Sequence, residues 1–162
     1  MRVKMLFCRE VEVGIEKEYY KLMSTLNRFL EAQDLIFDQV MLELKFGRKS
    51  GHWMWYIFPQ LELGMSSISK FYSIKGREEA LEYLHHPILG SRLLESTRML
   101  LELKTNDPYK VFFGDDVKLK SSMTLFHGVS STDQNVFFEV LQKYFQGERC
   151  KRTVEMLDGG ME

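Results

Sequence analysis

The sequence contains little proline and little cysteine. Its three prolines, at positions 59, 87 and 108, leave long segments of the 162 residues free to form helices. The two cysteines, Cys8 and Cys150, have no Cys-x-x-Cys spacing, which excludes a zinc site built from cysteine clusters. The first ten residues lack the apolar run of a secretory signal, so we expect a cytoplasmic protein with reduced thiols.

Long apolar runs and a surplus of either charge are also absent. The longest apolar run, residues 53–58, is far shorter than the roughly 18 residues of a membrane span, so no membrane partner is expected. Lysine and arginine number 22 and aspartate and glutamate 23, which gives a formal net charge of −1. We expect no nucleic-acid partner, because phosphate contacts need a cationic surplus. The four histidines form no metal-ligand pattern, so neither a metal nor another cofactor is expected.

The apolar residues recur mostly at helical spacing. From residue 16 to 46 they repeat every three, four or seven positions, with Asn27 as a candidate cap and a break near Asp34. Further helices are expected at residues 66–72, 77–84, 87–104, 108–113, 116–127 and 131–146. The predicted fold class is all-α, a compact irregular bundle of about six to eight helices. We divide the chain into an extension at 1–26, a single helical domain at 27–157 and a frayed end at 158–162.

Aromatic residues are concentrated in one stretch that we expect to be non-helical. The run is His52-Trp-Met-Trp-Tyr-Ile-Phe-Pro-Gln60, and it follows Arg48 and Lys49. In a loop, such rings can supply flat walls for a base or a sugar, and the two cations can hold an anion. The same rings could instead form a hydrophobic plug between short helices.

A second candidate lies in the helix expected at 116–127. Lys118, Ser121 and Ser122 fall within one sector of about 100° beside an apolar face. A cation and two hydroxyls at the edge of a core suit a phosphate or a hydroxylated ligand. The alternative is a solvated lysine with two hydroxyls that bond to carbonyls of their own helix.

A third candidate is the segment His85-His-Pro-Ile-Leu-Gly-Ser-Arg92. The helix expected to begin at Pro87 has no acidic cap, so its N–H groups could receive an anion near Arg92. A histidine before proline, such as His86, is more often a cap or a packed ring than a catalyst. Ser66 and Ser69, shortly before Tyr72, form a smaller cluster of hydroxyls.

These stretches together resemble a known family, the bacterial "domain of unknown function 1810" family, some of whose members carry a calpastatin label. The matching blocks are Arg28-Phe-Leu-Glu-Ala-Gln33, Gly47-Arg-Lys49, His52 to Gln60, Gly64-Met-Ser66, Ser69, Tyr72-Ser-Ile74, Glu79 to Leu84, His86 to Leu93, Phe113-Gly114 and Lys118 to Phe126. The resemblance covers about residues 27–157. It implies an irregular all-helical fold like that of an uncharacterised mycobacterial protein, and no established activity.

One departure from that family lies near the end of the chain. Where the family usually has an aspartate after its final glycine, this sequence has Cys150, followed by Thr153. A more remote likeness is to the helical N-glycosidases that act on ADP-ribose and phosphoribosyl-type substrates, which is an analogy at the level of the fold.

The predicted function is binding of a small phosphorylated ligand that contains a ring, of the nucleotide-sugar or ribosyl-phosphate type, with N-glycosidase-like hydrolysis as the reaction considered. The alternative is a non-catalytic module that binds a protein through the aromatic loop, although no motif identifies a protein partner. The catalytic candidates are His52, Glu79 and His86. The ligand-binding candidates are Arg48, Lys49, Trp53, Trp55, Gln60, Ser66, Ser69, Tyr72, Arg92, Lys118, Ser121 and Ser122.

Overall fold

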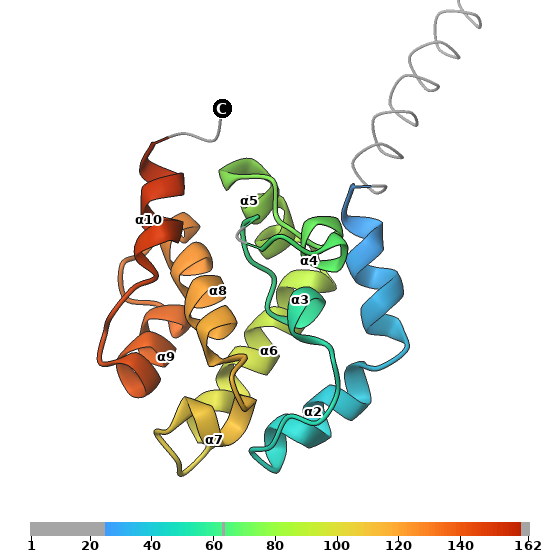
Figure 1. Cartoon of the computed structure of the whole chain (residues 1–162), viewed down its shortest axis with the longest axis vertical. Helices are drawn as coiled ribbons and strands as arrows, with labels where there is room; N and C mark the ends of the chain where they lie inside the picture. Colours follow the sequence, from blue (N-terminus) through green and yellow to red (C-terminus); the bar gives the residue numbers. More distant parts are fainter. Residues whose placement is uncertain (1–24, 63, 160–162) are drawn as a thin grey trace, which may run out of the picture.

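Helices account for nearly all the regular structure in the computed structural model, which describes residues 25–62 and 64–159 (Figure 1). The helices are α2 (Phe37–Lys45), α3 (Met54–Ile57), α4 (Ser67–Phe71), α5 (Arg77–His85), α6 (Leu89–Glu102), α7 (Pro108–Phe112), α8 (Asp116–Val129), α9 (Val136–Phe145) and α10 (Lys151–Asp158). Residues 25–34 form a further helical stretch before α2. The described residues contain no β-strand, only an isolated bridge between Leu61 and Ile74. The predicted all-α class is confirmed.

The described residues contain more helices than the predicted six to eight, for three reasons. Helix α10 (Lys151–Asp158) was not predicted. The long helical pattern that begins at residue 16 is broken by a turn at residues 35–36, close to the break expected at Asp34. The aromatic run was predicted to be non-helical, and this was wrong, because Met54–Ile57 forms a single helical turn. Most of the extension at 1–26 and of the end at 158–162 lies outside the described residues.

The central helix of the fold is α8. It contacts α5, α7, α9 and α10, and Figure 1 shows it between α9 and α10 on one side and α3 and α5 on the other. Every residue from Ser121 to His127 is buried. The predicted polar sector of this helix therefore faces other parts of the protein, and its hydroxyls lie in the interior.

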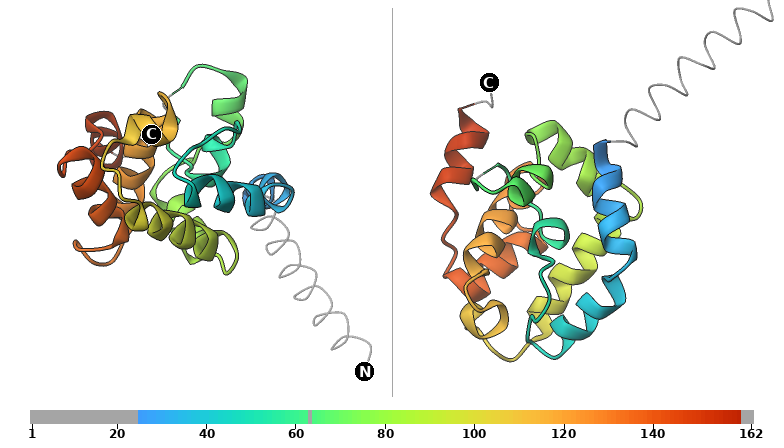
Figure 2. Two further views of the ribbon diagram at one scale, coloured as in Figure 1. Left: turned by 90° about the horizontal axis from the view of Figure 1, so that it is seen from below. Right: turned by 45° about the vertical axis from the view of Figure 1, so that its right-hand side comes forward.

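Helix α6 connects the two sides of the bundle. It runs diagonally behind α3 in Figure 1 and contacts α2, α5 and α9 through a face that includes Leu89, Leu93 and Leu100. Figure 2 shows from two further directions that residues 25–34 and α10 lie on opposite sides of the molecule. Segments distant in sequence thus enclose one core in the described part of the chain.

The helix starts follow local chemistry, although not always at the predicted residue. Ser66 accepts a hydrogen bond from the N–H of Ser69 and caps α4, at the first residue of the helix expected at 66–72. The helix expected at 131–146 begins later, because Asn135 caps α9 through the N–H of Phe138. Asn27, a predicted cap, lies inside the helical stretch 25–34.

Candidate functional site

A buried carboxylate organises the loop that precedes the aromatic run. Glu43 is 7% exposed and accepts hydrogen bonds from the N–H of Ser50 (2.8 Å), the N–H of Gly51 (3.1 Å) and the indole Nε1 of Trp53 (2.7 Å). Burial alone would raise the pKa of Glu43, but these donors stabilise the carboxylate and lower the pKa from 4.5 to about 2. Glu43 is therefore ionised at neutral pH and fixes the position of Trp53.

Trp53 is part of the core. Its ring is 1% exposed and lies 6.2 Å from Phe58 and 6.5 Å from Phe112, measured between ring centroids. The ring therefore has no open face on which a ligand could stack. Of the two tryptophans, only Trp55 is half-buried and keeps part of its surface accessible. Trp53 thus follows the alternative prediction, in which the ring fills the core between short helices. Only Trp55 could serve as the flat wall predicted for a ligand.

Two lysines share one carboxylate beside Trp55. Lys49 Nζ lies 2.8 Å from one oxygen of Asp115, and Lys118 Nζ lies 2.5 Å from the other. The Lys118 ammonium also lies 4.5 Å from the centroid of the Trp55 ring, a cation–π distance. Burial alone would raise the pKa of Asp115, but hydrogen bonds and charge from both lysines lower it below its ordinary value. The group carries two positive charges and one negative charge.

The hydroxyls predicted on α8 lie one turn further along the helix. Ser121 Oγ bonds to the carbonyl of Val117 (3.0 Å) and lies 3.4 Å from the Cys150 thiol. Ser122 follows Lys118 by four residues and is fully buried, and its Oγ has no hydrogen-bond partner among the described residues. An unpaired buried hydroxyl costs about 1–3 kcal/mol, and Ser122, being fully buried, is closed to a ligand in this structure.

Cys150 adjoins this same face of α8. It precedes α10, and its backbone N–H donates to Thr124 Oγ1 at 2.9 Å. Burial would raise the pKa of the thiol, but hydrogen bonds from Ser121 and from the first N–H groups of α10 lower it. Cys150 therefore lies within 3.4 Å of Ser121, a placement that the sequence did not indicate.

The hydroxyls before Tyr72 are used within α4. Ser69 Oγ donates to the carbonyl of Ser66 at 2.8 Å, and the Ser66 side chain is the helix cap. Tyr72 packs against the rings of Tyr56 (5.1 Å) and Phe71 (4.8 Å). Both serines thus have structural roles within their own helix.

Arg92 belongs to a separate polar group. Its guanidinium pairs with Asp34 at 2.8 Å and lies 3.4 Å from the side-chain oxygen of Gln33. Gln33 in turn donates to the hydroxyl of the buried Tyr83 at 2.8 Å. Arg92 is therefore engaged by a residue of the helical stretch 25–34.

The three catalytic candidates lie in different surroundings. Glu79 pairs with Arg28 at 2.6 Å. The ring nitrogen Nδ1 of His86 accepts from the N–H groups of Ile88 and Leu89, both at 3.2 Å, and so occupies the helix start that was expected to receive an anion. His52 is exposed, and no side-chain interaction of it is found among the described residues. Their catalytic roles remain predictions.

The remaining ligand-binding candidates lie near the ends of the same loop. Arg48 is exposed and lies over the ring of Phe113 at 5.4 Å. Gln60 is half-buried, and its backbone carbonyl accepts from the N–H of Ile74. The structure therefore brings Lys49, Trp55, Lys118 and the two α8 serines into one neighbourhood. It separates Arg92, Glu79 and His86 from them.

Two residues of the candidate site were missed by sequence reasoning. Glu43 shares the buried face of α2 with Val40 and Leu44, and an acid at such a position is a signal that spacing could have revealed. Asp115 precedes α8 but makes no side-chain capping bond, and it joins Lys49 to Lys118 instead.

Metal and membrane sites were also sought in the described part of the chain. There, no three histidine, cysteine, aspartate or glutamate side chains are grouped as metal ligands. None of the helices in residues 25–62 and 64–159 has both the length and the apolar character needed to cross a membrane.

Comparison with known proteins gives a family and a fold but no activity. No curated protein gives a significant match. Among solved structures, the chain is similar to the conserved hypothetical protein Rv1873 from Mycobacterium tuberculosis, with 43% identity and a TM-score of 0.79 over 82% of this chain and 96% of that one. A family model described as "Protein of unknown function (DUF1810)" matches residues 23–157. The match begins four residues before the predicted boundary and ends at the predicted residue, so this chain belongs to the DUF1810 family.

Proposed function

We propose that the chain binds a small phosphorylated, ring-containing ligand, of the nucleotide-sugar or ribosyl-phosphate type, at Trp55 and Lys118. The observation that carries this proposal is the 4.5 Å approach of the Lys118 ammonium to the Trp55 ring. A planar ring and a cation at this spacing match the two parts of such a ligand, its base or sugar and its phosphate.

The charge of the neighbourhood favours an anion. Lys49 and Lys118 share the carboxylate of Asp115, so these three side chains together carry a net charge of +1. The ionised Glu43 lies on the Lys49 side, because Glu43 and Lys49 both bond to the backbone of Gly51. The Lys118 side chain is 28% exposed, whereas that of Lys49 is 7% exposed. Lys118 is therefore the cation that would contact the phosphate, and Lys49 keeps Asp115 ionised and in place.

The hydroxyls on α8 add less to the proposal than Lys118 does. Ser122 Oγ lacks a partner among the described residues but is fully buried, and Ser121 Oγ donates to the carbonyl of Val117, as the alternative interpretation of these hydroxyls expected. The proposal therefore rests on Trp55 and Lys118, and a role for Ser121 and Ser122 in binding stays a prediction.

A more specific version of this proposal is that the chain hydrolyses the bound ligand in a reaction of the N-glycosidase type. Such a reaction needs a group that protonates the leaving base. Among the three catalytic candidates, His52 alone keeps its side chain without an interaction in the described structure, and it precedes Trp55 by three residues on the same loop. If His52 serves as that acid, His52→Ala will abolish release of a free base from a ribosyl substrate while leaving ligand binding intact.

The alternative, a protein-binding module that uses the aromatic loop, has less support. Trp53, Met54, Ile57 and Phe58 are all buried in the core. The loop therefore offers a protein partner little apolar surface, apart from part of Trp55.

Thermal-shift measurements test the binding proposal directly. ADP-ribose, ribose 5-phosphate and inorganic phosphate are added in turn, and at 100 times its dissociation constant a ligand stabilises the folded protein by about 2.7 kcal/mol. Lys118→Met should remove the shift. Lys120→Met is the matched control, because Lys120 lies on the same helix, pairs with Glu148 at 3.1 Å and lies 5.8 Å from the Phe145 ring.

The outcomes separate the proposal from its alternatives. A shift that Lys118→Met abolishes and Lys120→Met preserves supports the site. No shift with any of the three compounds at millimolar concentration contradicts the ligand class. Equal loss in both variants would mean that the binding reflects general surface charge.

A further inference from the structure

A cavity of about 440 Å³ lies between α5, α6 and α9, away from the candidate site. Its walls are apolar and come from Leu81, Leu84, Leu94, Val129, Val136 and Phe137. The volume is within the usual range of small-molecule sites. Val129 is at the opposite end of α8 from Lys118, about 16 Å along the helix axis, so the two sites share no lining residue.

Six polar side chains line this cavity. Ser130, Thr132 and Asn135 already donate to backbone carbonyls of the protein. The other three, which can each donate hydrogen bonds, are Arg98 of α6, His85 of α5 and Ser131 of the loop before α9. All three are exposed, and none has a side-chain partner among the described residues. No aspartate or glutamate lines the cavity. A guanidinium that no carboxylate neutralises, at the mouth of an apolar cavity, is complementary to a ligand with an apolar body and one anionic end.

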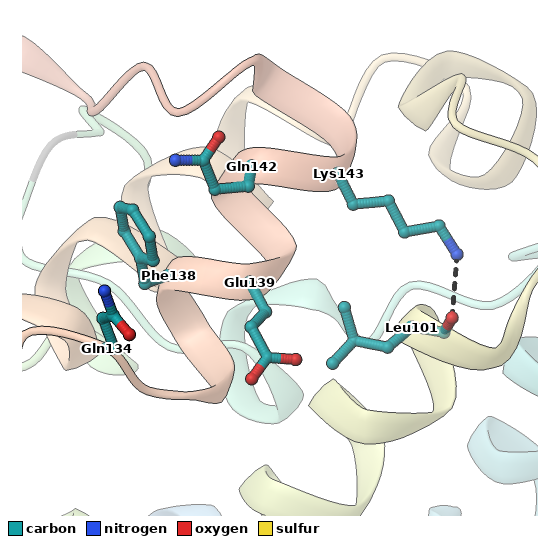
Figure 3. Close-up of a pocket in the computed structure, with 6 residues that line it drawn as sticks. All are labelled: Leu101, Gln134, Phe138, Glu139, Gln142 and Lys143. Atoms are coloured by element: carbon teal, nitrogen blue, oxygen red, sulfur yellow. Dashed lines mark hydrogen bonds between the residues drawn. The ribbon is translucent and has the colours of Figure 1, made fainter.

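The neighbouring cavity provides a contrast. It lies on the other side of α9 and is lined by Leu101, Gln134, Phe138, Glu139, Gln142 and Lys143 (Figure 3). Its cation is already used, because Lys143 Nζ donates to the carbonyls of Leu100 and Leu101 at 3.0 Å and also to that of Leu103. The Glu139 carboxylate adds a negative charge. The charges at the cavity beside Lys143 therefore disfavour the binding of an anion, whereas those at the cavity beside Arg98 favour it.

We propose that the cavity between α5, α6 and α9 binds a small carboxylic acid with an aliphatic or aromatic body. The apolar walls enclose the body, and the planar guanidinium of Arg98 holds the carboxylate through paired N–H donors. Ser131 and His85 lie at the same opening and can donate to the remaining lone pairs of the carboxylate. The proposal does not depend on the Trp55–Lys118 site.

Calorimetric titration with octanoate, 1-octanol and octyltrimethylammonium tests this proposal on the full chain. Octanoate is expected to bind saturably and at least tenfold more tightly than 1-octanol, and the ammonium compound should not bind. Affinity should also rise by about threefold or more for each CH₂ from hexanoate to octanoate, because each methylene enters an apolar environment.

Arg98→Met is the decisive variant, because the side chain is exposed and its loss should leave the fold intact. This variant should bind octanoate at least tenfold more weakly than the unaltered chain and bind 1-octanol with unchanged affinity. Two control variants should bind octanoate as the unaltered chain does. They are Lys104→Met, which removes another exposed cation, and Lys118→Met. Leu94→Trp, which fills the cavity, should abolish binding.

Three results would overturn the proposal. The first is that octanoate does not bind even at about 10 mM, ten times the dissociation constant of a millimolar site. The second is that Arg98→Met binds octanoate as tightly as the unaltered chain does. The third is that Leu94→Trp does so. Failure of the octanoate titration would leave the phosphorylated-ligand proposal standing, since that proposal is tested with other compounds and another variant.

Discussion

Single residues carry much of the organisation at the candidate site, and Glu43 is the clearest case. A carboxylate on the buried face of a helix is costly unless donors surround it. Here two backbone N–H groups and an indole N–H converge on it from the loop that follows α2. Glu43 therefore holds both the loop and the tryptophan in place. Trp53 could not turn towards a ligand without breaking its indole hydrogen bond to Glu43.

Replacement of this acid gives a prediction with a defined pH dependence. The folded-state pKa of Glu43 is about 2, against 4.5 for an ordinary glutamate. Its stabilising effect is thus complete above pH 4.5 and is lost as the pH falls towards 2. Glu43→Gln should lower the free energy of unfolding by about 3 kcal/mol at pH 7, and the difference should nearly vanish at pH 2. Urea titrations at both pH values measure this.

An exposed acid provides the control for Glu43. Glu102→Gln, at the end of α6, should change the free energy of unfolding by less than about 0.5 kcal/mol at pH 7. A similar loss in both variants, or a Glu43→Gln deficit that persists unchanged at pH 2, would contradict the role assigned to the buried carboxylate.

Hydrogen bonds at the helix ends determine where each helix begins, and the start of α6 is the clearest example. Pro87 was predicted to open this helix, but the helix begins two residues later, at Leu89. His86 turns back so that Nδ1 accepts from the first free N–H groups. The ring must be unprotonated at that nitrogen, and burial correspondingly lowers the pKa of His86.

This cap predicts that the helix start weakens in acid. Because the folded-state pKa of His86 lies below 6.5, its stabilisation is present above about pH 6.5 and is lost as the pH falls through the folded-state pKa. His86→Ala should cost about 1 kcal/mol at pH 8 and much less at pH 5. Chemical denaturation at the two pH values measures the difference, with His85→Ala as the neighbouring exposed control.

The His86 prediction has a simple contradicting result. Equal losses at pH 8 and pH 5 would show that the ring acts through packing and not through its nitrogen. His127 is also buried with a lowered pKa, so the comparison must be made between variants at the same pH and not between pH values of one chain.

At the scale of the whole molecule, one continuous core joins the described helices other than α4. The buried apolar residues run from Phe29 through α3, α5 and α8 to Phe145 without a second cluster. Aromatic rings link neighbouring elements across this core, for example Tyr83 to Phe126 at 5.6 Å and Phe126 to Phe137 at 5.7 Å. A domain of this size with one core should unfold cooperatively.

Equilibrium unfolding tests this cooperativity. Urea transitions followed by tryptophan fluorescence and by far-ultraviolet circular dichroism should coincide, because Trp53 lies in the same core as the helices that give the dichroism signal. Phe126→Leu should move both transitions together to lower urea, by an amount that corresponds to about 1–2 kcal/mol. Separate midpoints for the two probes would show that part of the bundle unfolds independently.

Much of the fold could be predicted from the sequence because helical periodicity and end signals are local properties. The segments expected at 77–84, 108–113, 116–127 and 131–146 all contain helices of the structure. The errors occur where a longer-range contact overrides a local preference. The turn Met54–Ile57 follows Trp53, which the distant Glu43 holds in the core, and α9 begins after Asn135, which caps it through the N–H of Phe138.

The site could be predicted only in part, for a related reason. The grouping of Lys118 with Ser121 and Ser122 follows from helix geometry alone, and the structure preserves it. Nothing in the spacing places Trp55 over Lys118, since these residues are 63 positions apart in the sequence. The separation of Arg92 from this group depends on Asp34, which reaches it only after the chain has turned.

The sequence by itself determined the all-α class, most of the helical segments and the family, because these depend on residue order and on interactions within a few positions. The tertiary structure decided which aromatic residue is buried, which lysine is accessible and where an acid is ionised. Burial, desolvation and ion pairing arise between segments that meet only in the folded chain. For that reason Trp53 and Trp55, two residues apart and chemically identical, lie in different environments, one in the core and one beside Lys118.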